Sequence, residues 1–472
     1  MDPRKARHTA PGYAYDEAED EAYAKRKRTE NESQYQRSKL SCPVAKRCGG
    51  CEWLAMPYDV QLKRKQAYIE ELFAGYRCKV DPIVGMEDPV GYRNKVQLPL
   101  AAGHPDRDGN MTVRFGIFER GTHSIVPCDE CLVEDKRARP IIATVAKLME
   151  ELHIRPYDEK TGEGALRYAL VRTANATNEI MLTLVCTSPR IPSQRPFIDK
   201  LLEKHPEITT IVLNVNRERT SVILGNDEKV IMGPGYIEDE LCGCRFRISS
   251  SSFYQTNPRA AENLYNLAIE MADLKSSDLI GDAYCGTGTI GIVAAKKSGA
   301  ELLGVERNGD AVEDARDNAD LNGVTNAEFI TGDAGSVYAR MARAGEKLDV
   351  VFMDPPRAGS SQAFLANLSR LGPRRVVYIS CEPKSQIRDI QALVKNGYQV
   401  KRIAPVDMFP HTDHVENIVL LERPPRGTYS GRYSANDHRS SEERRSNPYN
   451  HQYDKNGRRM YFGKRRKKKA SE

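Results

Sequence analysis

The sequence has no run of 18 consecutive apolar residues, although a membrane-spanning helix needs about that many. Its first residues are charged and contain no apolar stretch of the kind that directs secretion. Cysteine is sparse, with 11 in 472 residues, and an odd number of thiols cannot all pair. These absences argue against a membrane-spanning protein and a disulfide scaffold. We expect a reduced, cytoplasmic protein whose clustered cysteines are metal ligands or nucleophiles.

Positive charge is scarce outside the C-terminal tail, although the formal net charge of the whole chain is +6. Residues 425–472 hold 14 Lys and Arg against 5 Asp and Glu, a net of +9, which leaves −3 for residues 1–424. A body with this charge excludes a histone-like protein that coats nucleic acid through a wholly basic surface. The distribution indicates a slightly acidic folded body that carries a basic appendage.

Two terminal segments have compositions that are typical of disorder. The first 40 residues hold nine Lys and Arg and eight Asp and Glu, with almost no large aliphatic residues. The tail is rich in Arg, Ser, Asn, Tyr and Lys, lacks hydrophobic periodicity and ends in KRRKKKASE. Such segments cannot bury enough apolar surface to offset the loss of chain entropy. We therefore expect residues 1–41 and 425–472 to be disordered, in agreement with the low mean hydropathy of −0.59.

A first folded unit is predicted over residues 42–248. It begins with a cysteine-rich loop, and an amphipathic helix is expected over residues 58–73. Strand-like runs such as IMLTLVC and TTIVLNV then dominate, interrupted by helices over about 139–152 and near 197–204. This mixture predicts an α+β domain.

A second folded unit is predicted over residues 249–424, where the pattern changes to alternating strands and helices. Short apolar strands end in runs such as DLIGDAYC, ELLGVE, DVVFMDPP and RVVYISC, and helices are expected over about 258–273, 290–298 and 310–322. This spacing predicts parallel β-α units in an α/β, doubly wound sheet. Ligands bind such sheets at the carboxyl ends of the strands, so candidate site residues are sought there.

A glycine-rich turn follows the first of these strands. Gly286 and Gly288 let the backbone pass close under a ligand, and the next helix presents its N-terminal amides. Glu306 ends the second strand, where a carboxylate can accept hydrogen bonds from ribose hydroxyls, and Asp333 ends the third, near an adenine edge. The dinucleotide signature is incomplete because Gly291 stands in a different local context. S-adenosylmethionine is therefore a better fit than NAD.

A candidate nucleophile and its neighbours follow the next two strands. Asp354 opens the run DPPR, whose Arg357 suits a phosphate or carbonyl contact, and Cys381 directly follows the strand RVVYIS. A cysteine after a buried strand is often only a packing residue. The position at the strand end, next to a proline-shaped turn, favours an exposed and reactive thiol. Cys285 is the rival thiol, but it lies inside the glycine-rich turn.

A candidate general base opens the last strand of this unit. Glu416 begins the run ENIVLL, and a carboxylate there is either a solvated strand-edge group or a base whose pKa is raised by partial burial. His414 is the rival base, although a histidine in this position can equally orient the backbone.

A group of cysteines stands at the start of the first folded unit. Cys42, Cys48 and Cys51 are closely spaced, and Cys131 lies 80 positions beyond Cys51. Three clustered thiols and one remote thiol are typical of a metal site, but spacing alone does not separate zinc from an iron–sulfur cluster. Cys128 is a rival fourth ligand.

Taken together, these motifs resemble the cluster-containing RNA (uracil-5-)-methyltransferase family, most closely its bacterial 23S ribosomal RNA enzymes. The resemblance covers about four-fifths of the chain, and the matching runs are the cysteine group, QLKRK, GYRNK, GALRYALVR, SFYQTNP, DAYCGTG, DPPR, ISCEP and HVENI. It implies a Rossmann-like S-adenosylmethionine-dependent methyltransferase domain preceded by an α+β cluster-bearing domain. It also implies ribosomal RNA as the partner, with transfer RNA as the alternative, no membrane, and a monomer.

The resemblance also assigns roles to individual residues. It implies that Cys381 is the nucleophile that adds to carbon 6 of uracil and that Glu416 accepts the proton from carbon 5. A [4Fe–4S] cluster is expected on four cysteines, with Cys131 preferred over Cys128 because it fits the family's pattern. The expected ligands and methyl-donor contacts are Cys42, Cys48, Cys51 and Cys131 for the cluster, and Gln255, Tyr284, Gly286, Gly288, Glu306, Asp333 and Asp354 for S-adenosylmethionine.

RNA binding requires cationic side chains near the reacting uridine, which must be flipped into the site. Arg93, Lys95, Arg167, Arg172 and Arg357 are candidate phosphate contacts, although single arginines are more often surface ions. The run KRRKKK in the tail is expected to add salt-dependent, sequence-independent affinity.

Overall fold

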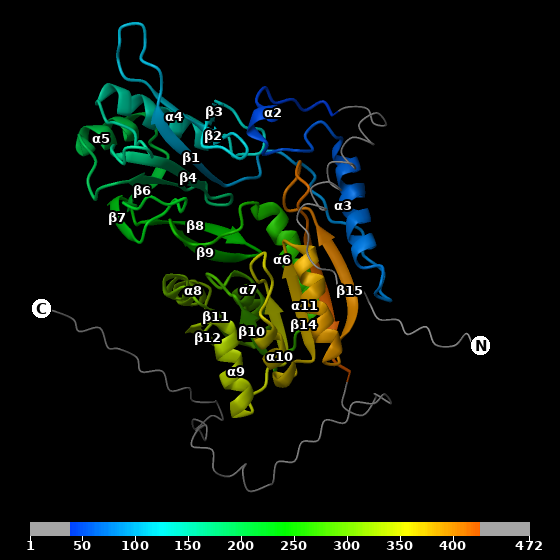
Figure 1. Cartoon of the computed structure of the whole chain (residues 1–472). Coiled ribbons are helices and arrows are strands. Elements are labelled where there is room, and N and C mark those ends of the chain that lie inside the picture. Colours follow the sequence, from blue (N-terminus) through cyan, green and yellow to red (C-terminus); the bar gives the residue numbers. More distant parts are fainter. Residues whose placement is uncertain (1–37, 425–472) are drawn as a thin grey trace, which may run out of the picture.

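The computed structural model describes residues 38–424, and two seven-stranded sheets dominate it, one above the other in Figure 1. The disorder predicted for the two termini falls on residues 1–37 and 425–472, which lie outside the described residues. No helix among the described residues is long and apolar enough to cross a membrane.

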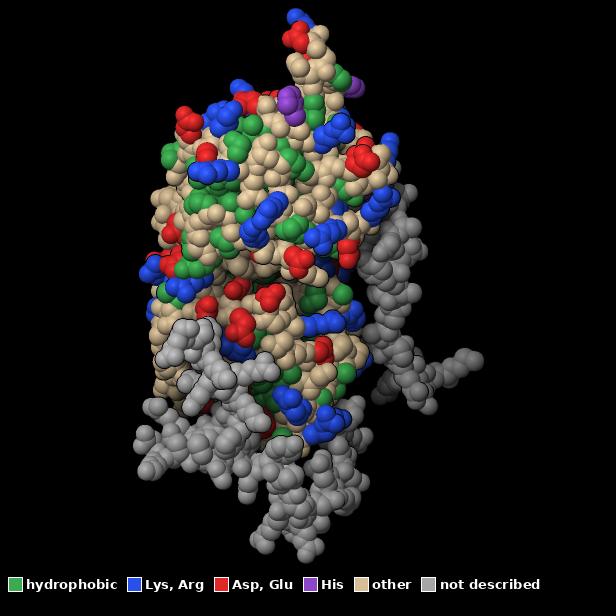
Figure 2. Space-filling view, turned by 90° about the vertical axis from the view of Figure 1, so that its left-hand side faces the viewer, with side chains coloured by type: hydrophobic (Ala, Val, Ile, Leu, Met, Phe, Trp, Pro, Cys, Tyr) green, Lys and Arg blue, Asp and Glu red, His purple; other side chains and the backbone are tan. Residues whose placement is uncertain are grey.

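The first sheet has the order β3-β2-β1-β4-β5-β6-β7, and all of its pairs are antiparallel except β5 with β6. Helices α4 and α5 pack on it through a core of aliphatic side chains, and the loop between β1 and β2 projects from the body (Figures 1 and 2). The elements are α2 (Ala45–Cys48), β1 (Lys95–Ala102), β2 (Val113–Phe118), β3 (Ile125–Pro127), α4 (Ala138–Glu151), β4 (Leu166–Thr173), β5 (Ile180–Cys186), α5 (Gln194–Lys204), β6 (Ile208–Val215) and β7 (Asp227–Met232).

The second sheet has the order β12-β11-β10-β13-β14-β16-β15. Its first five strands are parallel, as the alternating pattern predicts. Its strands are β10 (Leu279–Ala283), β11 (Glu301–Glu306), β12 (Ala327–Thr331), β13 (Val350–Met353), β14 (Arg375–Ser380), β15 (Gln399–Val406) and β16 (Glu416–Glu422). The sheet is preceded by a two-stranded hairpin of β8 (Tyr236–Leu241) and β9 (Cys244–Ser249).

The last two strands add an antiparallel edge that the alternating pattern did not indicate. Strand β16 runs antiparallel to both β14 and β15, and β15 lies at the sheet edge, where the sequence pattern had indicated no strand. Only the short loop of residues 407–415 joins β15 to β16. A connection of this length allows an antiparallel pair, whereas a parallel pair needs a longer crossover.

Helices cover both faces of the second sheet, which confirms the α/β, doubly wound prediction. One face carries α6, α7 and α8, and the other carries α9, α10 and α11. Asn257 starts α6 by accepting a hydrogen bond from the amide of Ala260, and Pro258 occupies the first helical position. The helices are α6 (Pro258–Ala272), α7 (Thr289–Ser298), α8 (Gly309–Leu321), α9 (Ala334–Ala344), α10 (Gln362–Leu371) and α11 (Pro383–Lys395).

One N-terminal helix packs on the second sheet rather than on the first. Helix α3 (Tyr58–Leu72) lies beside β15 and α11 (Figure 1). Ile69, Phe73 and Val80 are buried in the same core as α9, α10 and α11. The predicted division at residues 248 and 249 is untested, but the segment around α3 contributes its apolar face to the second sheet.

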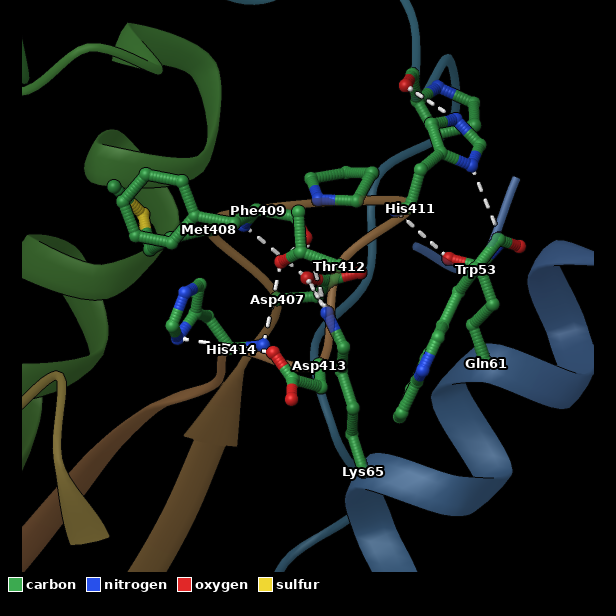
Figure 3. Close-up of polar contacts among 12 residues, drawn as sticks. Trp53, Gln61, Lys65, Asp407, Met408, Phe409, His411, Thr412, Asp413 and His414 are labelled. Atoms are coloured by element: carbon green, nitrogen blue, oxygen red, sulfur yellow. Dashed lines mark hydrogen bonds and ion pairs between the residues drawn. The ribbon is translucent and has the colours of Figure 1, made fainter. Parts of the chain in front are cut away.

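A buried ion pair joins α3 to the loop before β16 (Figure 3). Lys65 Nζ lies 2.7 Å from Asp407 Oδ1, and both side chains are fully buried. Lys65 also donates to the carbonyl oxygen of Phe409, and the Tyr58 hydroxyl donates to Asp407 Oδ2. Burial lowers the pKa of Lys65, and the charge of Asp407 opposes that shift. The attraction between the two charges therefore offsets the cost of removing each of them from water.

Replacing Lys65 with Met should leave a buried, unpaired carboxylate at Asp407 and lower the free energy of unfolding by about 3–5 kcal/mol. Urea denaturation of both proteins would measure this loss. The control is Lys63→Met on the same helix, which breaks an exposed pair with Asp59 and should change stability by less than about 0.5 kcal/mol. Equal midpoints for the two variants would contradict the structural role of the buried pair.

Candidate active site

The glycine-rich turn after β10 leaves open space beside a strained backbone. Gly286 has φ of 55°, and a Cβ built there would have no neighbouring atom within 4 Å. Gly288 differs, because a Cβ there would lie 2.9 Å from Ile292 Cδ1. Tyr284 has φ of 66°, a conformation that costs energy in a residue other than glycine and is common at functional sites. Gly286 therefore leaves room for a ligand, whereas Gly288 allows close packing of the helix.

Two carboxylates stand near this turn at the carboxyl edge of the sheet. Glu306 ends β11, and its Oε2 accepts a hydrogen bond of 3.2 Å from the amide of Gly286. Asp333 lies just beyond β12 and caps α9, where its Oδ1 accepts from the amide and hydroxyl of Ser336 at 2.9 Å each. Asp333 is exposed, and Glu306 is partly buried. The structure thus holds Glu306 in contact with the turn and Asp333 at the next strand end.

Buried polar groups that the sequence motifs did not single out lie beneath the turn. Asp282 accepts a hydrogen bond of 3.0 Å from the amide of Gly291, and burial raises its pKa to about 8, with further contributions from Asp354 and Glu306. Tyr265 lies 3.2 Å from the hydroxyl of Thr289. Burial raises the pKa of Tyr265, and Gln255 interacts with the same hydroxyl. Asp282, Tyr265 and Gln255 are thus buried polar side chains near the turn.

The register of β14 and β16 brings the candidate nucleophile and base together. Ser380 pairs with Asn417 in this antiparallel ladder, so Cys381 and Glu416 are the next residues on the two strands. Strand β13 ends on the other side of β14, and Asp354 follows it directly. The three candidate side chains therefore come from three adjacent strand ends at one edge of the sheet.

The charges of these groups influence one another. Burial raises the pKa of Cys381 to about 11, with Glu416 and Asp354 adding to the shift and Arg357 opposing it. Burial also raises the pKa of Glu416 to about 8, and Asp354 adds to this shift while Arg357 again opposes it. Burial alone raises the pKa of Asp354 to about 7. At neutral pH the thiol keeps its proton, while the two carboxyl groups are able to exchange protons.

The two rival residues lie in different surroundings. Cys285 is buried in the core between the sheet and its helices, and burial raises its pKa well above the usual value, which is typical of an unreactive thiol. The side chain of His414 is about half exposed and lies 4.0 Å from Asp413, with its ring edge toward Phe409 (Figure 3).

The cysteine group lines one small cavity of about 30 Å³ beside α2. None of these thiols forms a disulfide. Burial raises the pKa of Cys51 to about 12, and Cys131, Cys48 and Cys42 add to the shift, so the four thiols lie close enough to interact. The rival Cys128 also lines the cavity, but its thiol donates to the carbonyl oxygen of Glu130 at 2.7 Å.

The fit of these residues to a metal centre is partial. The donor set suits an iron–sulfur cluster, because four unpaired thiols line one cavity. Within residues 38–424, however, no group of three or more His, Cys, Asp or Glu side chains is arranged to hold a metal ion. The cysteines that are grouped in the sequence thus also lie close together in the structure, but their thiols are not arranged in a metal-coordination geometry.

One residue near the site was not singled out by the sequence analysis, and two that were lie in surroundings that the sequence did not indicate. Phe253 precedes the Gln255 segment, and its large apolar side chain is 67% exposed. The one feature of the sequence that could have indicated this exposed ring is an aromatic residue within a polar loop. Lys95 and Arg172 pair across β1 and β4, and Arg172 is fully buried. Both are candidate phosphate contacts in the sequence analysis. Their pairing was not predicted, because the pattern of a strand does not reveal which strand lies beside it.

Comparison with known proteins gives consistent results. Residues 57–424 match the family model described as tRNA (Uracil-5-)-methyltransferase. An uncharacterized RNA methyltransferase of Halalkalibacterium halodurans is 38% identical over 390 residues, covering 82% of this chain and 84% of the relative. One of Caldanaerobacter subterraneus is 39% identical over 385 residues, covering 81% and 84%.

A solved structure also resembles the whole described fold. It is the tRNA (uracil-54, C5)-methyltransferase of Pyrococcus abyssi in complex with S-adenosyl-L-homocysteine, with 30% sequence identity and a TM-score of 0.65. The similarity covers 82% of this chain and 88% of that one. Both sheets therefore belong to a known arrangement.

Replacing Arg357 with Met should move the pH dependence of Cys381 alkylation upward by about 0.5–1 pH unit, because Arg357 lowers the thiol pKa through its charge and through a side-chain hydrogen bond. Peptide mass spectrometry after timed iodoacetamide treatment would follow this one thiol among the 11. Arg343→Met, an exposed change on α9, is the control and should leave the profile in place. A downward shift for Arg357→Met would contradict the assigned electrostatics.

Proposed function

This chain belongs to the RNA (uracil-5-)-methyltransferase family, and on that premise we propose that it methylates carbon 5 of a specific uridine in 23S ribosomal RNA through a covalent adduct with Cys381. The observation that carries the proposal is the register that sets Cys381 beside Glu416, with Asp354 at the next strand end. We further propose that the protein acts in the cytoplasm as a monomer.

S-adenosylmethionine is the cofactor that the family supports, and when bound it supplies an electrophilic methyl group. The open space at Gly286 and the neighbouring carboxylate of Glu306 fit a nucleoside with ribose hydroxyls. We propose that Glu306 binds the ribose and Asp333 the adenine edge. The remaining contacts with the donor are proposed for Gln255, Tyr284, Gly288 and Asp354.

The residue types at the strand ends suit chemistry on uracil. Carbon 5 of uracil is a poor nucleophile, and addition of a thiolate from Cys381 to carbon 6 leaves an enolate that is nucleophilic at carbon 5. After the methyl group is added, Glu416 takes the proton from carbon 5, and elimination releases the thiol. Because Cys381 holds its proton at neutral pH, the thiol must lose that proton before attack. A carboxylate with a pKa near 8 can serve as the acceptor for a carbon acid.

The target uridine must leave its stack to reach this edge of the sheet. An exposed aromatic ring at Phe253 beside the site is suited to base stacking. The face in Figure 2 carries Lys and Arg side chains interspersed with Asp and Glu, without a continuous basic surface on that face. We assign the selection of RNA to local contacts near the strand ends that carry Cys381 and Glu416.

We also propose a [4Fe–4S] cluster bound by Cys42, Cys48, Cys51 and Cys131. Four thiols that line one cavity support it, and so does the hydrogen bond that occupies the thiol of Cys128. The cluster also favours ribosomal RNA, because the sequence resembles the cluster-containing 23S enzymes in this group of cysteines. No catalytic step is assigned to it.

Transfer RNA is the second candidate substrate. The matching family model carries a transfer-RNA description, and the similar Pyrococcus abyssi protein is named as a tRNA (uracil-54, C5)-methyltransferase. The residues at the strand ends do not separate the two substrates, because the same uracil chemistry applies to both.

Replacing Cys381 with Ala should abolish both methyl transfer and the covalent complex with 5-fluorouracil-substituted RNA. Replacing Glu416 with Gln should lower turnover by about 10²–10⁴-fold while the adduct on ordinary RNA accumulates, because only proton removal is blocked. Denaturing gels with labelled RNA would detect the adduct. Normal turnover in either variant would refute the role given to that residue.

Mapping 5-methyluridine in ribosomal and transfer RNA from cells that lack this protein should reveal a missing modification in 23S ribosomal RNA. Complementation with the intact chain should restore it, and complementation with Cys381→Ala should not. A modification lost from transfer RNA alone would instead select the second candidate substrate.

Anaerobically purified protein should be brown, with an absorbance band near about 400 nm, if the cysteines hold an iron–sulfur cluster. Cys131→Ser should lose iron, whereas the matched variant Cys128→Ser should retain it. Colourless protein that contains zinc would overturn the cluster proposal.

A further inference from the structure

Two basic side chains pair across the first sheet without any acidic partner. Lys95 of β1 stands opposite Arg172 of β4. Arg172 is fully buried, and its Nη2 donates to the carbonyl oxygen of Ser252 at 2.9 Å, while Nε and Nη1 have no partner. Within residues 38–424, Lys95 forms no ion pair and no side-chain hydrogen bond. Buried cations normally have partners, so this arrangement is costly for the fold.

A third cation strengthens the local positive potential. Burial lowers the pKa of Lys95 to about 8, and both Arg172 and Arg93 add to the shift. Burial likewise lowers the pKa of Arg172 to about 10, opposed only by Tyr254 and Asp314. Since mutual repulsion and burial both disfavour these charges, a bound anion would stabilise all three.

These cations lie against the segment that leads into the candidate active site. Arg172 bonds to Ser252, and the amide of Asn94 donates to the carbonyl oxygen of Thr256 at 2.9 Å. The Asn94 side chain donates to the carbonyl oxygen of Gln255 at 3.2 Å. The basic group is therefore built into the contact between the first sheet and the segment of residues 252–256.

A second arginine on the same strand has more interaction partners than Arg172. Arg167 also lies on β4, but its Nη1 donates to the carbonyl oxygens of Asn216 and Glu218, and its guanidinium covers the ring of Tyr157 at 4.5 Å. Two carbonyl oxygens and an aromatic ring thus hold the Arg167 guanidinium, although its Nε has no partner. Arg172 has a single hydrogen bond, and two of its nitrogen atoms, Nε and Nη1, have no partner.

We infer that Arg93, Lys95 and Arg172 form a binding site for a backbone phosphate of the RNA substrate, next to the pocket that receives the uridine. The inference rests on the proposed function for the identity of the anion. We favour a phosphodiester over the carboxylate of the methyl donor as the bound anion. Lys95 and Arg172 lie on the first sheet, whereas the residues proposed to contact the methyl donor, except Gln255, lie in the turn and at the strand ends of the second sheet. The half-buried Lys95 and Arg93 would contact the phosphate, with Arg172 beneath them.

The test measures RNA affinity of the full chain as a function of salt. Fluorescence anisotropy with a labelled, uridine-containing RNA of about 20 nucleotides would give Kd between about 50 and 300 mM salt. Lys95→Met and Arg172→Met should each weaken binding several-fold at low salt and reduce the slope of log K against log salt by about 0.7–1. Arg172→Lys should restore part of the slope. The control Arg195→Met removes an exposed charge on α5 and should leave the slope unchanged.

Two further measurements make the result decisive. Thermal melting identifies a variant that fails to fold. If Arg172→Met does not fold, Lys95→Met is used instead, because Lys95 is less buried. Affinity for S-adenosyl-L-homocysteine should stay unchanged. If the variants lose affinity for S-adenosyl-L-homocysteine while the salt dependence of RNA binding is unchanged, the cations bind the cofactor carboxylate and the inference is wrong. The inference is also wrong if folded variants keep the original salt dependence of RNA binding.

The outcome is separable from that of the proposed function. Methyl transfer by the unmodified protein to ribosomal and transfer RNA is measured without any variant at this site. If the unmodified protein transfers methyl groups and the slopes do not change, only the phosphate site fails. If the slopes change but no RNA is methylated, only the proposed reaction fails.

Discussion

Antiparallel pairing of β16 with β14 places Ser380 opposite Asn417, and so sets Cys381 and Glu416 side by side at one edge of the second sheet. A thiol and a carboxylate that lie 35 positions apart in the chain become neighbours through this one ladder. Parallel pairing of β13 with β14 then adds Asp354 from the other side. The strand register thus holds the proposed reacting groups at the ends of rigid elements, which is what precise positioning of a substrate requires.

The loop that leads into Glu416 is held from a distant part of the chain. Gln61 on α3 accepts a hydrogen bond from the amide of His411, and the Lys65–Asp407 pair holds the start of the same loop (Figure 3). The amide of Trp53 donates to the carbonyl oxygen of His411 at 2.9 Å, and Trp53 follows the cysteine group closely. Trp53 and α3 are therefore both joined by hydrogen bonds to the loop that leads into Glu416, so the N-terminal segment supports the position of this loop.

Charge is separated between the two sheets near the site. Acidic side chains gather at the carboxyl edge of the second sheet, where burial raises the pKa values of Asp282, Asp354 and Glu416. Basic side chains gather on the first sheet, where burial lowers the pKa values of Lys95 and Arg172. Such opposed shifts are typical of functional sites. With the phosphate site proposed above, a body with little net charge binds a polyanion through cations that are concentrated in one place.

Local sequence determined the elements and many of the site residues. The helix expected over 58–73 is observed at Tyr58–Leu72, and the one expected over 258–273 at Pro258–Ala272. Hydrophobic periodicity and capping residues are local signals, so they reveal where an element lies and which face is buried. Cys381 and Glu416 could be selected as candidates because each stands next to a strand end, and the family could be inferred from its short motifs.

Tertiary structure alone decided which elements meet. The sequence did not indicate that β16 inserts antiparallel beside β14, that α3 packs on the second sheet, or that Lys95 faces Arg172. It suggested that the four cysteines group together, but not that they surround one cavity with Cys128. Strand partners, buried ion pairs and unpaired cations depend on residues that are tens to hundreds of positions apart in the chain. The free energy that selects these contacts comes from long-range packing rather than from local propensity.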